Sequence, residues 1–479
     1  MLRTERDSLG EHQVPAEAYY GIQTARALEN FPISGLRAQR ELVDATLFVK
    51  KAAALANRDL GRLDPRLAGA IVAAADEVLA GQLRDQFVID VYQAGAGTSH
   101  NMNVNEVLAN RAAERLGAPR GDYGLVHPND HVNMSQSTND VFPTATRLAL
   151  LMTHTRLLHA SRGLTESLAT KAHAFEDVLK VGRTHLQDAV PMTLGQEFGG
   201  YAACIDAACR EVEHAAGGLR ELNLGATAVG TGLNAGTDYT TRVIDHLREL
   251  TGLNLLAAKN RFRVTQSMGD VVTYVGALRR MAVELGKVAS DLRLLSMGPR
   301  AGLSEISLPA AQPGSSIMPG KVNPSIPEMV NQVCFQVIGC DLTVALAGEA
   351  GQLELNVMMP VIAWNSLHAS TILRESMRAL KERCVDGIQA DEARCAELLQ
   401  RSTAAATALS PYLGYAKTAE IAKEAVRTGK SIQTIATEQG LLPAATLERI
   451  LSAAGMTEPG IAGKLGPDSA SQDSQDNGQ

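Results

Sequence analysis

The sequence predicts a mainly α-helical protein built around long, packed helices, and three observations lead to this prediction. Aromatic residues make up only 4% of the chain, so the core has to be aliphatic, which suits helix packing better than a twisted sheet. One stretch repeats apolar residues at alternating steps of three and four: Leu278, Met281, Leu285, Val288, Leu292 and Leu295. A second stretch has a similar stripe: Phe198, Tyr201, Ile205, Cys209 and Val212. Such stripes are typical of one face of a helix that packs lengthwise on other helices.

The composition changes along the chain and divides it into parts. The first part mixes short helical segments with turn-formers, the second holds long helices that include 325–356 and 361–386, and the third has short helices with glycine stops. The last part is polar and low in apolar residues, which is typical of disorder. We therefore expect an N-terminal mixed, mainly helical domain over 1–139, a central long-helix bundle over 140–394, a small C-terminal helical domain over 395–465 and a disordered tail over 466–479.

Charge and hydropathy exclude several classes of protein. The formal net charge is −7, whereas a nucleic-acid-binding protein needs a concentrated basic face. No apolar run approaches the length needed to cross a bilayer, and the first ten residues do not resemble a signal peptide. We expect no nucleic-acid partner and no membrane. The helices of the central bundle are apolar on more sides than one small domain can cover, so we also expect a homo-oligomer.

The six cysteines are scattered along a chain too large to need disulfide staples. We expect reduced, buried thiols in a cytoplasmic protein. No CxxC pair and no zinc-type histidine spacing occurs in the sequence, so we expect no structural metal.

Four polar stretches interrupt the helical pattern. The segment NMSQSTND (133–140) supplies the helix-capping residues Ser137, Thr138, Asn139 and Asp140 just before a long helix. A helix N-terminus with free N–H groups and neighbouring hydroxyls also binds carboxylates, and both interpretations remain open.

The segment GAGTSHNMNVNE (95–106) lacks the third glycine of a dinucleotide loop and the GK[ST] of a phosphate loop. Nucleotide binding is therefore poorly supported. Thr98, Ser99 and Asn101 fit a small anionic ligand as hydrogen-bond donors.

The segment VGRTHLQDAVP (181–191) contains Thr184 and His185. A lone histidine is more often structural than catalytic. Glu328 has two open interpretations: it can close a capping box on Ser325 at the start of the next helix, or it can hold His185 in one tautomer.

The segment QPGSSIMPGKVNP (312–324) is neither helix nor strand by composition. Loops of this length are usually functional or disordered, and the apolar Ile317, Met318 and Val322 disfavour disorder. A loop that buries apolar groups in one state and moves in another is a lid. It carries four candidate site residues: Ser315, Ser316, Lys321 and Asn323.

The run GSSIMPGKVNP resembles the signature of the fumarase/aspartase superfamily, and all four polar stretches match that superfamily in order. The resemblance covers nearly the whole chain, from VPAEAYYGIQTARALENFPISG to LSPYLGYAKTAEIAKEA. GAGTSHNMN, QSTND, SIPEMVNQVCFQVIG and EAGQLELNVMMPVI are more similar to the aspartase branch than to class II fumarases. His100 and Cys340 depart from the family pattern, and His100 bears on the substrate.

The resemblance implies the three-domain fold of this superfamily and a homotetramer with a twenty-helix core, in which three subunits build each active site. It also implies an elimination that uses neither metal nor cofactor and converts L-aspartate to fumarate and ammonia.

The resemblance further implies a role for each matching residue. Ser315 is the base that removes the C3 proton, and Thr98, Ser137, Thr138 and Ser316 hold the dianionic aci-carboxylate. Lys321 and Asn323, with Thr184, bind the α-carboxylate. Asn139, with Thr98 and His185, lies near the amino group, and His185 paired with Glu328 orients the substrate. This chemistry suits preorganised neutral donors, because removing a proton beside a carboxylate places two negative charges on one group.

Two alternatives remain open. The first is another enzyme on the same scaffold, a fumarase acting on malate or a lyase for a modified aspartate. The second is a non-catalytic helical oligomer, although every expected polar position is present. The chain has no Ala-Ser-Gly triplet, from which another class of ammonia-lyase builds its electrophile.

Overall fold

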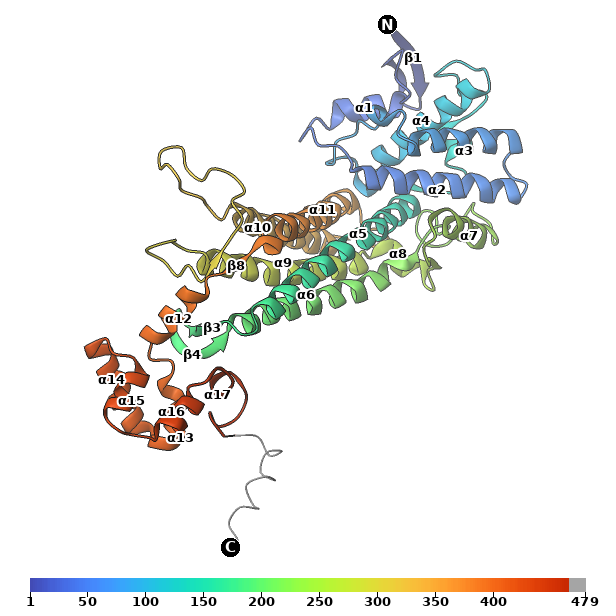
Figure 1. Ribbon diagram of the computed structural model, residues 1–479. Coiled ribbons are helices and arrows are strands. Elements are labelled where there is room, and N and C mark those ends of the chain that lie inside the picture. The colour runs from blue at the N-terminus through green and yellow to red at the C-terminus, as the bar shows by residue number, and fades with distance from the viewer. Residues whose placement is uncertain (465–479) are drawn as a thin grey trace. The chain divides into compact units, whose positions relative to one another are not determined.

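The structure of the protein, a computed structural model, describes residues 1–464 and is mainly helical (Figure 1). Within these residues, strands occur only as four two-stranded sheets and isolated bridges. The predicted tail over 466–479 lies outside the described residues.

The contacts divide the chain into two compact units. Unit 1 comprises Met1–Ala160, Ala208–Glu284 and Gln332–Ser376, and unit 2 comprises Ser161–Ala207, Leu285–Asn331 and the described residues from Met377 to Lys464. The division falls inside five long helices, so each of these helices contributes a stretch to both units. The expected three-domain division remains a prediction.

The N-terminal elements form their own core in unit 1. They are β1 (Leu2–Asp7), β2 (Gly10–Pro15), α1 (Ile22–Asn30), α2 (Arg40–Asp59), α3 (Pro65–Leu79), the short helices η1 (Arg84–Gln86) and η2 (Gly95–Gly97), α4 (Thr98–Arg115) and η3 (Pro128–Val132). The expectation of only short helical segments here is wrong, since α2 has 20 residues and α4 has 18. Alanine-rich stretches with high helix propensity, such as KKAAALA in α2, explain the length.

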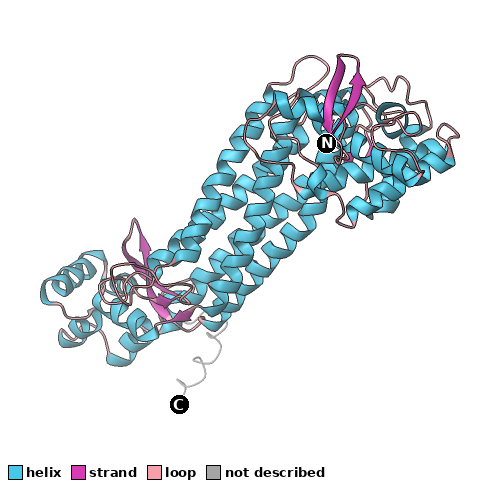
Figure 2. Ribbon diagram, turned by 90° about the horizontal axis from the view of Figure 1, so that it is seen from above, coloured by secondary structure: helices cyan, strands magenta, loops and turns pink. Residues whose placement is uncertain are grey.

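The middle of the chain holds the long helices. Its elements are α5 (Thr138–Ala174), β3 (Leu179–Thr184), β4 (Gln187–Thr193), α6 (Leu194–Ala215), η4 (Ala216–Arg220), β5 (Glu221–Leu222), α7 (Tyr239–Thr251), β6 (Leu256–Ala257), α8 (Arg261–Gln266), α9 (Gly269–Leu295), β7 (Ile306–Ser307), α10 (Ser325–Glu349) and α11 (Met359–Arg383). Within each unit, stretches of the long helices lie side by side (Figure 2). Every residue of the two predicted apolar stripes, on α9 and α6, is buried, which confirms the helical interpretation.

Two predicted helix ends are wrong. The helix expected over 325–356 ends at Glu349, where Gly351 and a short bridge between Gln352 and Leu355 turn the chain. The helix expected over 361–386 begins at Met359 and ends at Arg383. Apolar spacing alone did not mark these ends, because the periodic pattern continues past the last hydrogen-bonded turn.

Helix α10 has an apolar face that the chain leaves uncovered. Phe335, Ile338, Leu342 and Leu346 follow one another at steps of three and four, and Phe335 and Leu346 are 68% and 62% exposed. By length and composition, α10 is the one helix in the described residues that could cross a membrane. The expectation that no run reaches that length is therefore wrong for α10. One such helix is weak support for a membrane, because core helices pass the same test.

The C-terminal elements have a separate small core in unit 2. They are η5 (Val385–Gly387), β8 (Gln389–Ala390), α12 (Glu392–Arg401), α13 (Ala406–Leu413), α14 (Tyr415–Thr428), α15 (Ile432–Glu438), α16 (Ala444–Ile450) and α17 (Ala453–Thr457). Gly414 and Gly429 lie at the ends of α13 and α14 with φ of 76° and 73°, as the predicted glycine stops require.

Two hairpins were missed from the sequence. β1 pairs with β2 across the turn at Asp7–Gly10, and β3 pairs with β4 across the two residues His185 and Leu186. The second turn holds both residues at positive φ, 55° and 59°, without the glycine or asparagine that usually marks such a turn.

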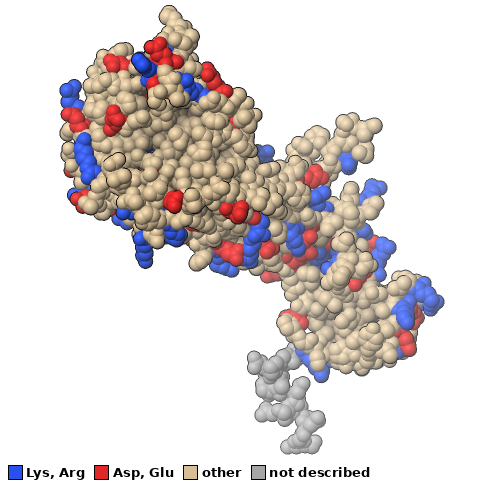
Figure 3. Space-filling model, turned by 180° about the vertical axis from the view of Figure 1, so that it is seen from behind, with Lys and Arg blue, Asp and Glu red and all other residues tan. Residues whose placement is uncertain are grey.

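Charges of both signs are interspersed over the face shown in Figure 3.

Candidate active site

The predicted site residues fall into two groups. Thr98, Ser137, Thr138 and Asn139 lie in unit 1, and the remainder lie in unit 2: Thr184, His185, Ser315, Ser316, Lys321, Asn323 and Glu328. Each group is described within its own unit.

Thr98 begins α4 directly after a strained turn. Ala96 and Gly97 have φ of 61° and 87°, and a Cβ on Gly97 would lie 2.2 Å from the ring of Phe142. Only glycine meets both conditions. The turn leaves the Thr98 side chain exposed at the N-terminus of α4, where the helix dipole favours an anion.

Ser137 and Asp140 cap the N-terminus of α5 reciprocally. The Ser137 N–H donates to Oδ1 of Asp140 (2.9 Å), and the Asn139 N–H donates to Oγ of Ser137 (3.2 Å). Oδ2 of Asp140 accepts hydrogen bonds from the N–H groups of Gly225 and Thr227. The capping interpretation of NMSQSTND is therefore confirmed, and the buried Asp140 carboxylate fixes the segment against the chain at 225–227.

The hydroxyl of Thr138 is held by a neighbouring amide. Asn101 Nδ2 donates to Oγ1 of Thr138 (3.2 Å), so the hydroxyl hydrogen of Thr138 remains free to be donated elsewhere. Asn139 Nδ2 donates to the carbonyl of Ala228 (2.8 Å). Ser137, Thr138 and Asn139 are all partly exposed.

A lysine that sequence reasoning did not single out lies beneath this segment. Lys50 of α2 is fully buried, and its Nζ donates to Oδ1 of Asn133 (2.8 Å) and Oε1 of Gln136 (2.9 Å). Burial lowers the pKa of Lys50 to about 7, while Asp140 acts in the opposite direction. Burial raises the pKa of Asp140 to about 7. The partners of Lys50 lie more than 80 residues away in sequence, so no local pattern indicated it.

His100 is a core residue. Its side chain is 2% exposed, its Nε2 lies 3.0 Å from Oγ1 of Thr46, and its ring meets that of Phe142 edge-on at 5.7 Å. Burial lowers the pKa of His100 to about 4, which leaves the ring neutral. Ser99 and Asn101 are buried as well, and their role as donors to a ligand stays a prediction.

In unit 2, Thr184 and His185 lie exposed at the tip of the β3–β4 hairpin. Arg183, next to them, donates through Nη1 to both oxygens of the buried Glu305 carboxylate (3.0 and 3.1 Å). Lys180 contacts the same carboxylate at 3.0 Å. These ion pairs hold β3 both at Lys180, near its start, and at Arg183, beside the turn. The positive φ of His185 is a strain of the kind that clusters at functional sites.

The loop over 312–324 is closed at its neck by its own atoms. The Gly314 N–H donates to the Lys321 carbonyl (2.9 Å), and Asn323 Nδ2 donates to the Gly314 carbonyl (2.6 Å). A Cβ on Gly314 would lie 2.6 Å from Asn323 N and Lys321 O, so the neck requires glycine there. The tip of the loop, including Ser316 and Lys321, is exposed.

Ser315 accepts two backbone hydrogen bonds within this loop. The N–H groups of Ile317 and Met318 donate to its Oγ at 3.2 and 2.9 Å. Donors aimed at an oxygen stabilise negative charge on it. Ile317 is 83% exposed and Met318 49%, so the burial that we expected for these apolar residues does not occur in this conformation.

The capping box expected at the start of α10 is not formed. The Ser325 N–H donates to the Asn323 carbonyl (2.8 Å), and no hydrogen bond or ion pair joins the Glu328 carboxylate to Ser325 or His185 within residues 1–464. In a capping box, the Glu328 carboxylate would accept from the Ser325 N–H, but here that N–H donates to the Asn323 carbonyl.

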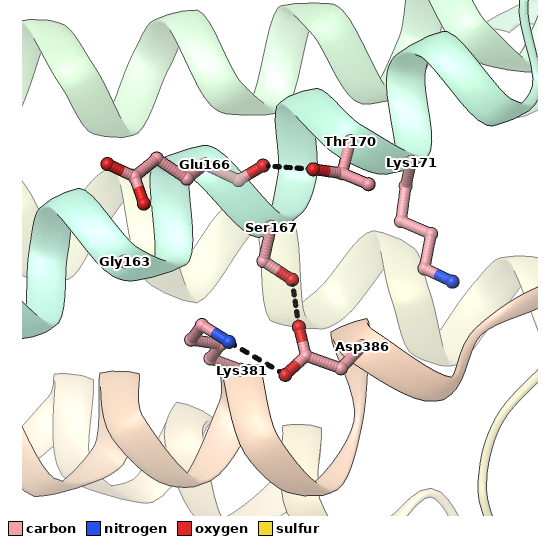
Figure 4. Close-up of a pocket in the computed structure, with 7 residues that line it drawn as sticks. All are labelled: Gly163, Glu166, Ser167, Thr170, Lys171, Lys381 and Asp386. Carbon is pink, nitrogen blue, oxygen red and sulfur yellow. Dashed lines mark hydrogen bonds and ion pairs between the residues drawn. The ribbon is translucent and has the colours of Figure 1, made fainter.

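A cavity of about 280 Å³ lies elsewhere in unit 2 (Figure 4). It is lined by Gly163, Glu166, Ser167, Thr170, Lys171, Lys381 and Asp386. Asp386 accepts hydrogen bonds from Ser167 and Lys381 (2.8 Å to Nζ), and Thr170 donates to the Glu166 carbonyl. Lys171 donates through Nζ to the Ile388 carbonyl (2.8 Å). None of the predicted site residues lines the cavity.

All six cysteines are free thiols. Five are buried, but Cys204 is exposed, so the expectation of buried thiols is wrong for this residue. Within the described part of the chain, no group of three His, Cys, Asp or Glu residues is placed to hold a metal ion.

Comparison with known protein families shows the family of the chain. A model described as "Lyase" matches residues 10–339, and one described as "Fumarase C C-terminus" matches residues 406–458. The chain belongs to the fumarase/aspartase superfamily of lyases. Membership confirms both the predicted fold class and the sequence resemblance.

Members of the superfamily under two names are similarly close to this chain. Aspartate ammonia-lyase of Bacillus subtilis (strain 168) is 49% identical over 462 residues, covering 96% of this chain and 97% of that protein. A class II fumarate hydratase of Ralstonia nicotianae is 50% identical over 443 residues, covering 92% and 96%. The crystal structure of a fumarate lyase:delta crystallin from Brucella melitensis bound to cobalt is 53% identical, with a TM-score of 0.90, covering 94% and 98%.

Proposed function

We propose that this superfamily lyase is an aspartate ammonia-lyase, which converts L-aspartate reversibly to fumarate and ammonia. The proposal is carried by its near-full-length similarity to proteins of that name, at 49–50% identity. In the forward reaction, a proton leaves C3, the C2–N bond breaks, and the electron pair forms the double bond of fumarate. The developing dianion on the C4 carboxylate is the species that the site has to stabilise.

Ser315 is the base in this proposal. The two backbone N–H groups that converge on its Oγ support the role, since they stabilise the alkoxide that must form before a proton can be taken from carbon. A positioned base contributes about 10²–10⁴-fold to the rate. Its place on an exposed, self-closed loop supports a lid that covers the substrate and expels water.

Thr98, Ser137, Thr138 and Ser316 hold the aci-carboxylate in this proposal. Thr98 begins α4 and Ser137 caps α5, so both offer hydroxyls beside helix N-termini, where N–H dipoles favour negative charge. Each donor aimed at developing charge is worth roughly 3–4 kcal/mol.

The other candidates bind the amino-acid end of the substrate. Lys321 and Asn323, with Thr184, bind the α-carboxylate, and Asn139 lies with His185 near the amino group. Glu328 holds the imidazole of His185 when the site is assembled. We assign no metal or cofactor a part in the reaction.

A homotetramer with sites shared by three subunits accounts for two features of the chain. The exposed apolar face of α10, from Phe335 to Leu346, is the kind of patch that marks an interface between proteins. The two groups of site residues also lie in different units, and their side chains are partly or fully exposed. Free thiols fit the cytoplasmic location that we propose.

One assay tests the function. Purified protein is incubated with L-aspartate or with L-malate, and fumarate is followed by its ultraviolet absorbance. We expect fumarate from aspartate. Fumarate from malate alone would replace the proposal with a class II fumarase, the candidate that the Ralstonia nicotianae relative supports. Fumarate from neither would favour a non-catalytic oligomer.

A further inference from the structure

Lys50 is a buried cation held by amides. Its side chain is 0% exposed, and both of its hydrogen bonds in the described structure go to neutral amide oxygens, of Asn133 and Gln136. Burying an ammonium group is costly unless something nearby compensates the charge. Asp140 is the described carboxylate that acts on it through space. The cost of burying the Lys50 ammonium group has to be offset. The hydrogen bonds that lead from Lys50 toward Thr138 indicate how.

The amides form a chain that leads from Lys50 to Thr138. Oδ1 of Asn133 accepts from Lys50 and also from Nδ2 of Asn101 (3.2 Å) and Asn105 (3.1 Å). Because Lys50 fixes this oxygen as an acceptor, Asn101 must present its NH₂ group, and the same NH₂ group donates to Oγ1 of Thr138. One lone pair of the Thr138 hydroxyl is then occupied, and its hydrogen remains free to be donated to a ligand.

Helix α2 also holds the backbone of the same segment. Asn57, two turns after Lys50, donates through Nδ2 to the Met134 carbonyl (3.1 Å) and accepts through Oδ1 from Ser135 (2.8 Å). Ser135 has a φ of 63°, so this segment is held in a conformation that it would not adopt freely.

We propose that Lys50 is a positioning residue: its buried charge orients the amides of Asn133 and Asn101, sets the Thr138 hydroxyl as a donor, and provides positive potential behind the site for a dianionic dicarboxylate. This inference rests on the proposed function only in requiring a dicarboxylate ligand, whether aspartate or malate. Lys50 does not touch the substrate and acts through its partners.

The charged and titratable groups that face Lys50 are Asp140 of α5 and His100 of α4. Asp140 is its counter-charge, and His100 is neutral above a pKa of about 4. A bound anion stabilises protonated Lys50, because opposite charges nearby raise an amine pKa. Binding at pH 8 therefore takes up a proton, to which Asp140 also contributes.

The experiment measures binding of succinate, a saturated dicarboxylate that cannot react, by isothermal titration calorimetry at pH 8 in two buffers of different protonation enthalpy. We expect Lys50→Met to weaken succinate binding roughly 10–100-fold, as loss of an orienting partner does. We also expect it to take up fewer protons than the wild type. Lys51→Met is the matched control, since Lys51 lies on the same helix but pairs with Asp76. It should change neither quantity.

The possible outcomes distinguish a failure of the Lys50 inference from a failure of the proposed function. Equal affinity, or weaker binding with unchanged proton uptake, would make Lys50 merely structural. If Lys50→Met does not fold, the wild type still tests the inference, because the absence of proton uptake that grows between pH 6 and pH 8 would overturn it. A wild type that turns over neither aspartate nor malate and binds no succinate overturns both proposals together. A wild type that turns over malate alone leaves the inference in place.

Discussion

Two polar segments that look alike in sequence are built in opposite ways. The segment 133–140 is bonded to other elements at almost every residue, through Lys50 and Asn57 of α2, Asn101 of α4 and the backbone at 225–227. The loop over 312–324 has its described side-chain hydrogen bonds within itself, at Ser315 and Asn323. One segment is fixed from outside, whereas the other is held only at its own neck.

This difference matches what an elimination demands of each part. Donors that stabilise developing charge work best when they are already oriented, because reorganisation during the reaction would cancel their benefit. A base carried on a lid has to leave room for the substrate to enter and then exclude water. The four predictions below test this division, from the largest expected effect to the smallest.

Replacing Ser315 by alanine should remove the base without disturbing the fold. Its Oγ bonds only inside the exposed loop, so the melting temperature should stay unchanged. Turnover measured as fumarate production should fall by roughly 10²–10⁴-fold, the contribution of a positioned base. Near-normal turnover would remove Ser315 from the mechanism.

Mixing two inactive variants tests whether Thr98 of one subunit and Ser315 of another form the same active site. Thr98→Ala and Ser315→Ala chains are unfolded together in equal amounts and refolded. If Thr98 and Ser315 of one site come from different chains, about a quarter of the sites receive both intact residues by random assortment. Recovery near a quarter of wild-type activity supports shared sites. No recovery at all would place both residues of a site on one chain.

The buried charge of Lys50 should make stability depend on pH. Its folded pKa of about 7 lies below the ordinary 10.5, so above pH 7 the unfolded chain binds more protons and the wild type gains stability as pH rises. Relative to Lys50→Met, the gain between pH 7 and pH 9 should be roughly 2–3 kcal/mol. Urea midpoints at fixed chain concentration measure it. A difference independent of pH would show that the folded protein keeps Lys50 protonated across this pH range.

A substitution at the tip of the lid should leave the stability of the fold unchanged but reduce turnover. Ile317 is 83% exposed, so Ile317→Ser should change the free energy of unfolding by less than about 0.5 kcal/mol. If closure buries Ile317, kcat/KM should fall about tenfold, because the variant loses the free energy of burying one apolar side chain. Unchanged kinetics would argue against closure over this residue.

Sequence reasoning worked where a signal is local and periodic. The stripe from Leu278 to Leu295 predicted α9, and the hydroxyls before α5 predicted its cap. It failed where several arrangements satisfy the same local rule. The capping box suggested by Ser325 and Glu328 is absent, while the reciprocal cap of Ser137 and Asp140 is formed.

By itself, the sequence determined the helical class, the family and the positions of the polar segments, because periodicity, turn-formers and motif order are properties of neighbouring residues. Only the tertiary structure decided what those segments touch. Lys50 contacts Asn133 across a sequence separation of 83 residues, and Asp140 contacts the backbone at Gly225 across a separation of 85. Such contacts depend on how helices pack, and the energy of a buried charge depends on the partners that packing provides.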